Sequence, residues 1–166
     1  GVRYSLKSPQ SFLESNIIGT FNILEAARDR SCRHFLLAST SSVYGGSSKT
    51  PYHENDKADQ QLSFYAATKK SCESIAHVYS HIYGIPITCF RFFTVYGPWG
   101  RPDMALFSFT TKIIKGEPID VFNHGKMKRD FTYIDDLVES VYRLIEVAPE
   151  KNSKFNKSLV DDGSSM

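Results

Sequence analysis

The sequence predicts an α/β fold with a mostly parallel sheet, because helix-like and strand-like segments alternate along the chain. Helical periodicity, in which apolar residues recur every three to four positions, covers the long segments 12–30 and 63–83. Short runs rich in apolar and β-branched residues stand between the helices, and HFLLA at 34–38 is the plainest of them. Strands joined by helices form βαβ units, and such sheets bind ligands at the carboxyl ends of their strands.

Three elements are expected in the first half of the chain. The helix over 12–30 has its apolar residues near one stripe, and the strand over 34–38 is a short apolar run. The helix over 63–83 is stopped by Gly84 and by the proline two residues later. Thr40 follows the strand directly, so its hydroxyl falls at a strand's carboxyl end.

Four further elements are expected before a polar, weakly patterned tail. They are a β-rich run over 87–93, a helix over 105–115 stopped by Gly116, a short strand over 119–122, and a helix over 136–147 that Asp135 caps and Pro149 ends. Thr94 follows the β-rich run, as Thr40 follows the first strand.

Composition excludes several classes of protein. The 20 basic and 18 acidic residues leave a net charge of +2, so no large basic field exists to attract nucleic acid. Apolar runs are too short for a membrane-spanning helix. Three cysteines without a CxxC motif suggest neither a disulfide framework nor a zinc cluster, and His77 and His81 have no third ligand. We therefore expect no metal site.

The strongest chemical signal is the segment from Tyr65 to Lys69, YAATK. Residues four apart on a helix share a face, so the two side chains are neighbours. A tyrosine has an ordinary pKa of about 10, which is too high for a general base at neutral pH, but a nearby ammonium favours the phenolate. The pair is a candidate unit for moving a proton on a hydroxyl. Alone it is weak, because the same spacing occurs on solvated helix faces.

Several motifs in fixed order make the signal specific. They are a buried strand, STSSVYG at 39–45, YxxxK at 65–69, RFFTVYGP at 91–98 and RDFTYIDD at 129–136. Their order resembles the extended short-chain dehydrogenase/reductase family of nucleotide-sugar enzymes, over about residues 1–149. The resemblance implies the C-terminal half of a Rossmann-like doubly wound parallel sheet, with part of a small substrate-binding domain. The implied divisions are a partial NAD-binding domain over 1–95, substrate-binding and returning segments over 96–149, and a tail over 150–166.

The resemblance also implies NAD as the cofactor and a UDP-sugar as the substrate. Tyr65 would take the proton from the sugar 4-hydroxyl while C4 gives a hydride to NAD⁺. Thr40 would hydrogen-bond the same oxygen, and Lys69 would hold the nicotinamide ribose and act on Tyr65. Further cofactor contacts are implied for Arg3, Asn16, Ser39 and Phe93.

Residues between these anchors discriminate subfamilies. Dehydratases of the family resemble STDEVYG and uronate decarboxylases resemble STSEVYG, whereas this chain has Ser41 and Ser42 at the variable places. It therefore offers no carboxylate for elimination or decarboxylation there. The segment 91–105 resembles UDP-glucuronate 4-epimerases, and UDP-glucose 4-epimerases carry asparagine in place of Thr94. By this resemblance Thr94 and the two serines would hold the sugar carboxylate. Arg101 and Arg129 would bind the diphosphate, which suits a forked guanidinium.

The expected function is NAD-dependent 4-epimerisation of UDP-glucuronate to UDP-galacturonate in a longer parent enzyme. The chain begins with Gly1 and contains no glycine-rich GxGxxG turn, so we expect a fragment that is inactive by itself. One alternative is a non-catalytic fragment or an interaction partner of intact subunits, and another is a different nucleotide-sugar epimerase or decarboxylase of the family. The parent is expected to be a homodimer in the cytoplasm, with a membrane-anchored Golgi enzyme as the alternative.

Overall fold

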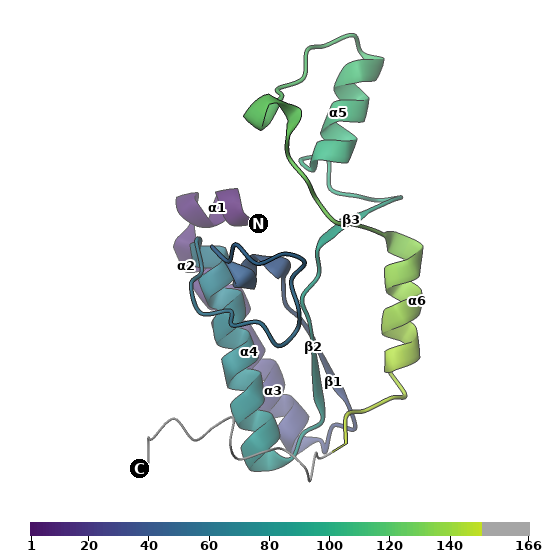
Figure 1. The fold of residues 1–166 in the computed structure, drawn as a ribbon. Coiled ribbons are helices and arrows are strands. Elements are labelled where there is room, and N and C mark those ends of the chain that lie inside the picture. The colour runs from purple at the N-terminus through teal and green to yellow at the C-terminus, as the bar shows by residue number, and fades with distance from the viewer. Residues whose placement is uncertain (151–166) are drawn as a thin grey trace.

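The computed structural model describes residues 1–150, and the tail expected over 150–166 lies outside the described residues except for its first residue. Two strand pairs organise these residues (Figure 1). Strands β1 (Phe35–Ala38) and β2 (Ile87–Phe90) pair in parallel, with Phe35 opposite Ile87. Strands β3 (Thr94–Tyr96) and β4 (Phe131–Tyr133) form a second parallel pair. The predicted α/β class with parallel pairing is confirmed.

Helices lie on both sides of the β1–β2 pair (Figure 1). Figure 1 shows α3 (Gly19–Asp29) and α4 (Phe64–Tyr83) on one side of these strands and α6 (Ile134–Leu144) on the other. Apolar residues between the strands and α3 and α4 form the main buried cluster, which comprises Leu24, Leu37, Cys72, Ala76, Tyr79 and Ile85. Helix α4 is thereby fixed against the strand ends, where ligands are expected.

The ends of α4 follow the sequence signals. The Ser63 side chain accepts a hydrogen bond from the Ala66 amide at 3.1 Å, which caps the amino end. Gly84 adopts a left-handed conformation with φ of 67°, which ends the helix at low steric cost. The helix expected over 63–83 is thus confirmed.

The first predicted helix is divided. The segment expected over 12–30 forms a π-helical turn, η1 (Leu13–Ile18), which continues into α3. Two short helices that were not predicted, α1 (Val2–Lys7) and α2 (Pro9–Phe12), come before it. A π-turn inserts one residue into the helical repeat, so sequence periodicity does not reveal it. Such turns occur mostly at functional sites, and η1 packs against α4.

The second half of the chain departs more from the expectations. The run over 87–93 divides into β2 and a connection to β3, and β4 was not foreseen. The strand expected over 119–122 is wrong: that segment pairs with no strand among residues 1–150 and leads into a 3-10 turn, η3 (Phe122–Gly125). Asn123 and His124 have positive φ there, and strand backbone does not allow this.

The last two helices differ from the expectation only at their ends. Helix α5 (Ala105–Ile114) stops just before the predicted boundary. Helix α6 begins at Ile134 with Tyr133 at its N-cap, so the prediction that Asp135 caps it is wrong. Asp135 instead lies in the first turn, where the helix dipole favours a negative charge.

Within residues 1–150, no helix is both long and apolar enough to cross a membrane. The same part of the chain brings together no group of three His, Cys, Asp or Glu side chains that could hold a metal ion.

Candidate active site at the ends of the parallel strands

Tyr65 and Lys69 lie in the first two turns of α4, on one face. The Tyr65 ring packs edge-on against Phe12, with ring centroids 5.8 Å apart, and its backbone amide donates to Ser5 Oγ at 3.2 Å. The Tyr65 hydroxyl forms no hydrogen bond within residues 1–150. Lys69 is half-buried and has no ion-pair partner in that range. Both polar ends remain available to a ligand.

The turn after β1 brings Thr40 against the same helix. Thr40 is buried and caps a 3-10 turn, η2 (Ser41–Tyr44), by accepting a hydrogen bond from the Ser42 amide at 3.2 Å. Turn η2 packs on α4. Thr40 therefore follows the carboxyl end of β1, as predicted, and belongs to a turn that packs on the helix of Tyr65.

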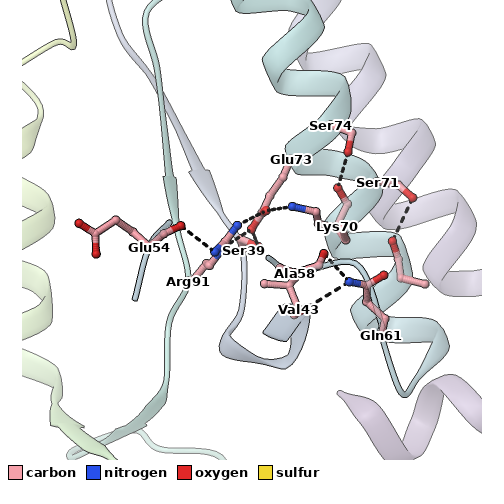
Figure 2. Close-up of polar contacts among 11 residues, drawn as sticks. Ser39, Val43, Glu54, Ala58, Gln61, Lys70, Ser71, Glu73, Ser74 and Arg91 are labelled. Atoms are coloured by element: carbon pink, nitrogen blue, oxygen red, sulfur yellow. Dashed lines mark hydrogen bonds and ion pairs between the residues drawn. The ribbon is translucent and has the colours of Figure 1, made fainter. Parts of the chain in front are cut away.

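A tight contact closes the loop after η2. Gly45 has φ of 57°, and a Cβ atom there would lie 1.8 Å from the Gln60 carbonyl oxygen, so no other residue fits without moving the backbone. The side-chain Nε2 of Gln61 donates to the carbonyls of Val43 at 3.0 Å and Ala58 at 2.7 Å (Figure 2). These contacts hold η2, with half-buried Ser41 and Ser42, in a defined position.

The π-turn connects Asn16 to α4. The side-chain Nδ2 of Asn16 donates to Thr68 Oγ1 at 2.9 Å, and the Thr68 hydroxyl donates to the Tyr65 carbonyl at 2.9 Å. The buried Cys72 thiol donates to the Asn16 carbonyl at 3.3 Å. Asn16 thus contacts the part of α4 that carries Tyr65 and Lys69, although its partner Thr68 is 52 residues away in sequence.

Three predicted substrate residues line one cleft of about 440 Å³. Thr94 comes from β3, Arg101 from the loop before α5, and Arg129 from the segment before β4. Arg101 forms a two-bond pair with Asp103, at 3.0 and 2.5 Å. The Asp103 hydrogen bonds raise the pKa of Arg101 above its ordinary value.

A buried polar cluster lies deeper along α4 (Figure 2). The Glu73 carboxylate accepts from Ser39 Oγ at 2.6 Å, from Arg91 at 3.1 and 3.0 Å, and from Lys70 at 3.1 Å. Burial by itself would raise the pKa of Glu73, but the hydrogen bonds from Arg91, Ser39 and Lys70 outweigh it and hold the pKa below its usual value. The Arg91 guanidinium also lies 4.8 Å from the centre of the Tyr44 ring.

Sequence reasoning missed this cluster. One signal was available, because Glu73 is the sole carboxylate within α4 and follows Lys69 by one helical turn. Its partners Ser39 and Arg91 follow two different strands, and only the fold brings them together.

The remaining predicted residues lie around this centre. Phe93 packs near Tyr44 and Tyr52, with ring centroids 6.5 and 6.2 Å away. Arg3 is exposed on α1. Ser39, expected at the cofactor, directs its hydroxyl to Glu73. The individual roles assigned to these residues stay predictions.

Known proteins resemble this chain over most of its length. A probable UDP-glucuronate 4-epimerase of Rhizobium meliloti (strain 1021) is 55% identical over 154 residues, which are 93% of this chain and 45% of the relative. UDP-glucuronate 4-epimerase 4 of Arabidopsis thaliana is 50% identical over 95% of this chain and 37% of its own length. The chain thus spans about half the length of the curated relatives it matches.

Solved structures agree with these relatives. The UDP-glucuronic acid 4-epimerase of Bacillus cereus, in complex with UDP-glucuronic acid and NAD, superposes with a TM-score of 0.83 at 40% identity. The match covers 92% of this chain and 48% of that one. The sequence profile described as the NAD dependent epimerase/dehydratase family matches residues 1–156. The chain therefore belongs to the NAD-dependent epimerase/dehydratase family.

Proposed function

We propose that this chain is the acid/base and substrate-binding part of a UDP-glucuronate 4-epimerase. The observation that carries the proposal is that turn η2, which Thr40 caps, packs on α4, the helix of Tyr65 and Lys69, while Thr94 lines one cleft with Arg101 and Arg129. The 4-epimerases among its relatives support the same reaction class.

The described residues fit the nicotinamide end of NAD. Lys69 is a half-buried cation without an ion pair in residues 1–150, which suits a contact with ribose hydroxyls. Asn16 donates a hydrogen bond to Thr68 on the same helix, and Phe93 packs near Tyr44 at the end of η2. When bound, NAD supplies the group that accepts a hydride from C4 of the sugar and later returns it.

The chain's own residues handle the proton. Tyr65 would act as the phenolate, the form that the nearby Lys69 ammonium favours, and would accept the proton of the 4-hydroxyl as the C4 hydride leaves. Thr40 hydrogen-bonds the same sugar oxygen and orients it. After the 4-keto sugar rotates, Tyr65 returns the proton to that oxygen as C4 regains its hydride on the opposite face. The proton and the hydride are both returned to the sugar, so the product is its C4 epimer.

Other residues choose the substrate. Arg101 and Arg129, which both line the cleft, would bind the diphosphate. Ser41, Ser42 and Thr94 donate hydroxyl hydrogen bonds to the sugar carboxylate. Ser41 and Ser42 offer no carboxylate as an acid or base for dehydration or decarboxylation, which favours epimerisation of the intact uronate.

We place this enzyme in the cytoplasm as a homodimer. The three cysteines are all unpaired, which suits a reducing compartment. Helices α3 and α4 expose apolar side chains. Among them, Phe21, Val78 and Ile82 have exposed fractions of 47%, 48% and 62%. A second copy of the same helix pair would cover them.

The test is an assay of a full-length protein that carries this sequence. Incubated with UDP-glucuronate and NAD, it should form UDP-galacturonate, which anion-exchange chromatography separates from the substrate. UDP-glucose should be converted more slowly, because it lacks the carboxylate. Release of CO₂ with a UDP-pentose would contradict epimerisation and favour a decarboxylase, and no conversion of either sugar would refute the proposal.

A further inference from the structure

We propose that Glu73 is a positioning residue of this site. Its carboxylate holds the end of β1 against α4, and so sets where the Thr40 hydroxyl stands relative to Tyr65. The inference rests on the proposed epimerase function and adds a residue that does not contact the substrate.

The helix places Glu73 in line with the acid/base pair. Tyr65, Lys69 and Glu73 are spaced by four residues each, so they follow one another along one face of α4. Tyr65 and Lys69 keep polar ends without partners in residues 1–150, whereas every charged contact of this face gathers on Glu73. Tyr65 and Lys69 can therefore contact a ligand, whereas the Glu73 carboxylate is bonded to other residues of the protein.

The partners of Glu73 come from both strand ends. Ser39 is the last residue before Thr40, and its hydroxyl bond to Glu73 is 2.6 Å. Arg91 directly follows β2, and its Nε and Nη2 donate to the two carboxylate oxygens of Glu73. Its Nη1 donates to the Glu54 carbonyl at 3.2 Å. Figure 2 shows Ser39, Arg91 and Lys70 converging on this one side chain. Tilting or sliding α4 would therefore break contacts to two strands at once.

Backbone bonds pass the constraint on to Thr40. The Ser39 amide donates to the Phe90 carbonyl at 2.7 Å, and the Ser41 amide to the Phe92 carbonyl at 2.9 Å. Thr40 lies between these two fixed residues and caps η2. Its hydroxyl has little freedom while Ser39 stays bound to Glu73. A displacement of about 1 Å at a reacting group can lower a rate on the order of 100-fold, so this constraint has catalytic consequences.

Two variants separate positioning from mere stability. Glu73→Gln keeps the size of the side chain and an acceptor for Ser39 but loses both ion pairs. Ser39→Ala removes only the link between Glu73 and the strand end. Glu139→Gln is the control, because Glu139 forms an equivalent Arg–Glu pair with Arg143 at 2.7 Å on the exposed surface of α6.

Each variant is made in a full-length protein carrying this sequence, and kcat and KM for UDP-glucuronate are measured per folded molecule with the NAD affinity. We expect Glu73→Gln and Ser39→Ala to lower kcat by roughly 10–100-fold while KM and NAD affinity change by less than about twofold. The double variant should be no slower than Glu73→Gln alone, because both changes break one linkage. Glu139→Gln should match the wild type.

Other outcomes overturn the inference. Unchanged kcat in Ser39→Ala, or additive losses in the double variant, would reduce Glu73 to a structural ion pair. If Glu73→Gln does not fold, the kcat of Ser39→Ala alone decides whether Glu73 positions Thr40. If the wild type converts no UDP-glucuronate, the proposed function fails separately, and amide hydrogen exchange over 39–44 decides the positioning claim. Exchange that is at least about tenfold faster in Ser39→Ala than in Glu139→Gln supports it, and equal exchange refutes it.

Discussion

The body formed by α3, α4, β1 and β2 differs sharply from the region formed by β3, β4, α5 and α6. Helix α4 buries five residues, whereas α5 and α6 bury none. The acid/base candidates lie on the packed body, and the candidate diphosphate ligands Arg101 and Arg129 lie in exposed segments. In the proposed mechanism, proton transfer takes place on the packed body, and the diphosphate contacts come from segments that bury few residues within 1–150.

This division has a physical basis. Proton transfer needs a fixed geometry, which buried helix–strand packing supplies. A diphosphate contact tolerates movement, because arginine side chains are long and the attraction between a guanidinium group and an anion falls off slowly with distance. Four predictions, from the largest expected effect to the smallest, test the contrast between the two regions.

The largest effect is expected on the packed body at Tyr65. Tyr65→Phe removes the proton acceptor and should lower kcat by about 10²–10⁴-fold, with nucleotide-sugar binding nearly unchanged. Steady-state kinetics of the full-length protein and calorimetric binding of UDP-glucuronate measure the two quantities. Tyr83→Phe, at the exposed far end of the same helix, is the matched control. A variant that keeps most of its activity would remove Tyr65 from the mechanism.

The stability contrast between the regions is tested by two aliphatic truncations. Leu24 is fully buried beneath α4, so Leu24→Ala should lower the free energy of unfolding by about 2–5 kcal/mol. Ile114 is 80% exposed at the end of α5, and Ile114→Ala should change it by less than about 0.5 kcal/mol. Urea denaturation of the full-length protein compares them. Equal losses of unfolding free energy in the two variants would show that Ile114 is covered in the full-length protein. The stability contrast between the two regions would then be absent.

A smaller effect is expected in the cleft. Thr94→Asn should shift the ratio of kcat/KM for UDP-glucuronate and UDP-glucose toward UDP-glucose by about tenfold, because one hydroxyl contact with the carboxylate is lost. Competition assays with both sugars report the ratio directly. Thr111→Asn, which alters the same cleft on α5, serves as the comparison. If both variants shift the ratio equally, Thr94 has no special role in selecting the uronate.

The smallest effect concerns the acid stability of the body. The folded state holds the pKa of Glu73 below its ordinary value of 4.5, so the carboxylate stabilises the fold above that pH and loses this contribution as pH falls through the lowered pKa. Glu73→Gln should therefore be less stable than the wild type at pH 7, with a smaller difference below pH 4.5. Thermal unfolding across this range measures it, and a difference independent of pH would contradict the assignment.

Much of the packed body was predictable from local signals. Ser63 and Gly84 mark the ends of α4, and a spacing of four residues puts Tyr65 and Lys69 on one face. The second region was harder, because the segment over 119–122 has strand-like composition but no partner strand in the described residues. Strand formation there depends on neighbours, and composition carries no information about them.

The sequence by itself determined the α/β class, the order of the motifs and the face shared by Tyr65 and Lys69, because periodicity and capping are local properties of the chain. Only the tertiary structure decided that Glu73 joins Ser39 to Arg91, that Asn16 reaches Thr68 from a π-turn, and that Thr94 shares a cleft with two arginines. Those pairings join segments far apart in sequence, and side-chain contacts at such separations are set by the packing of whole elements.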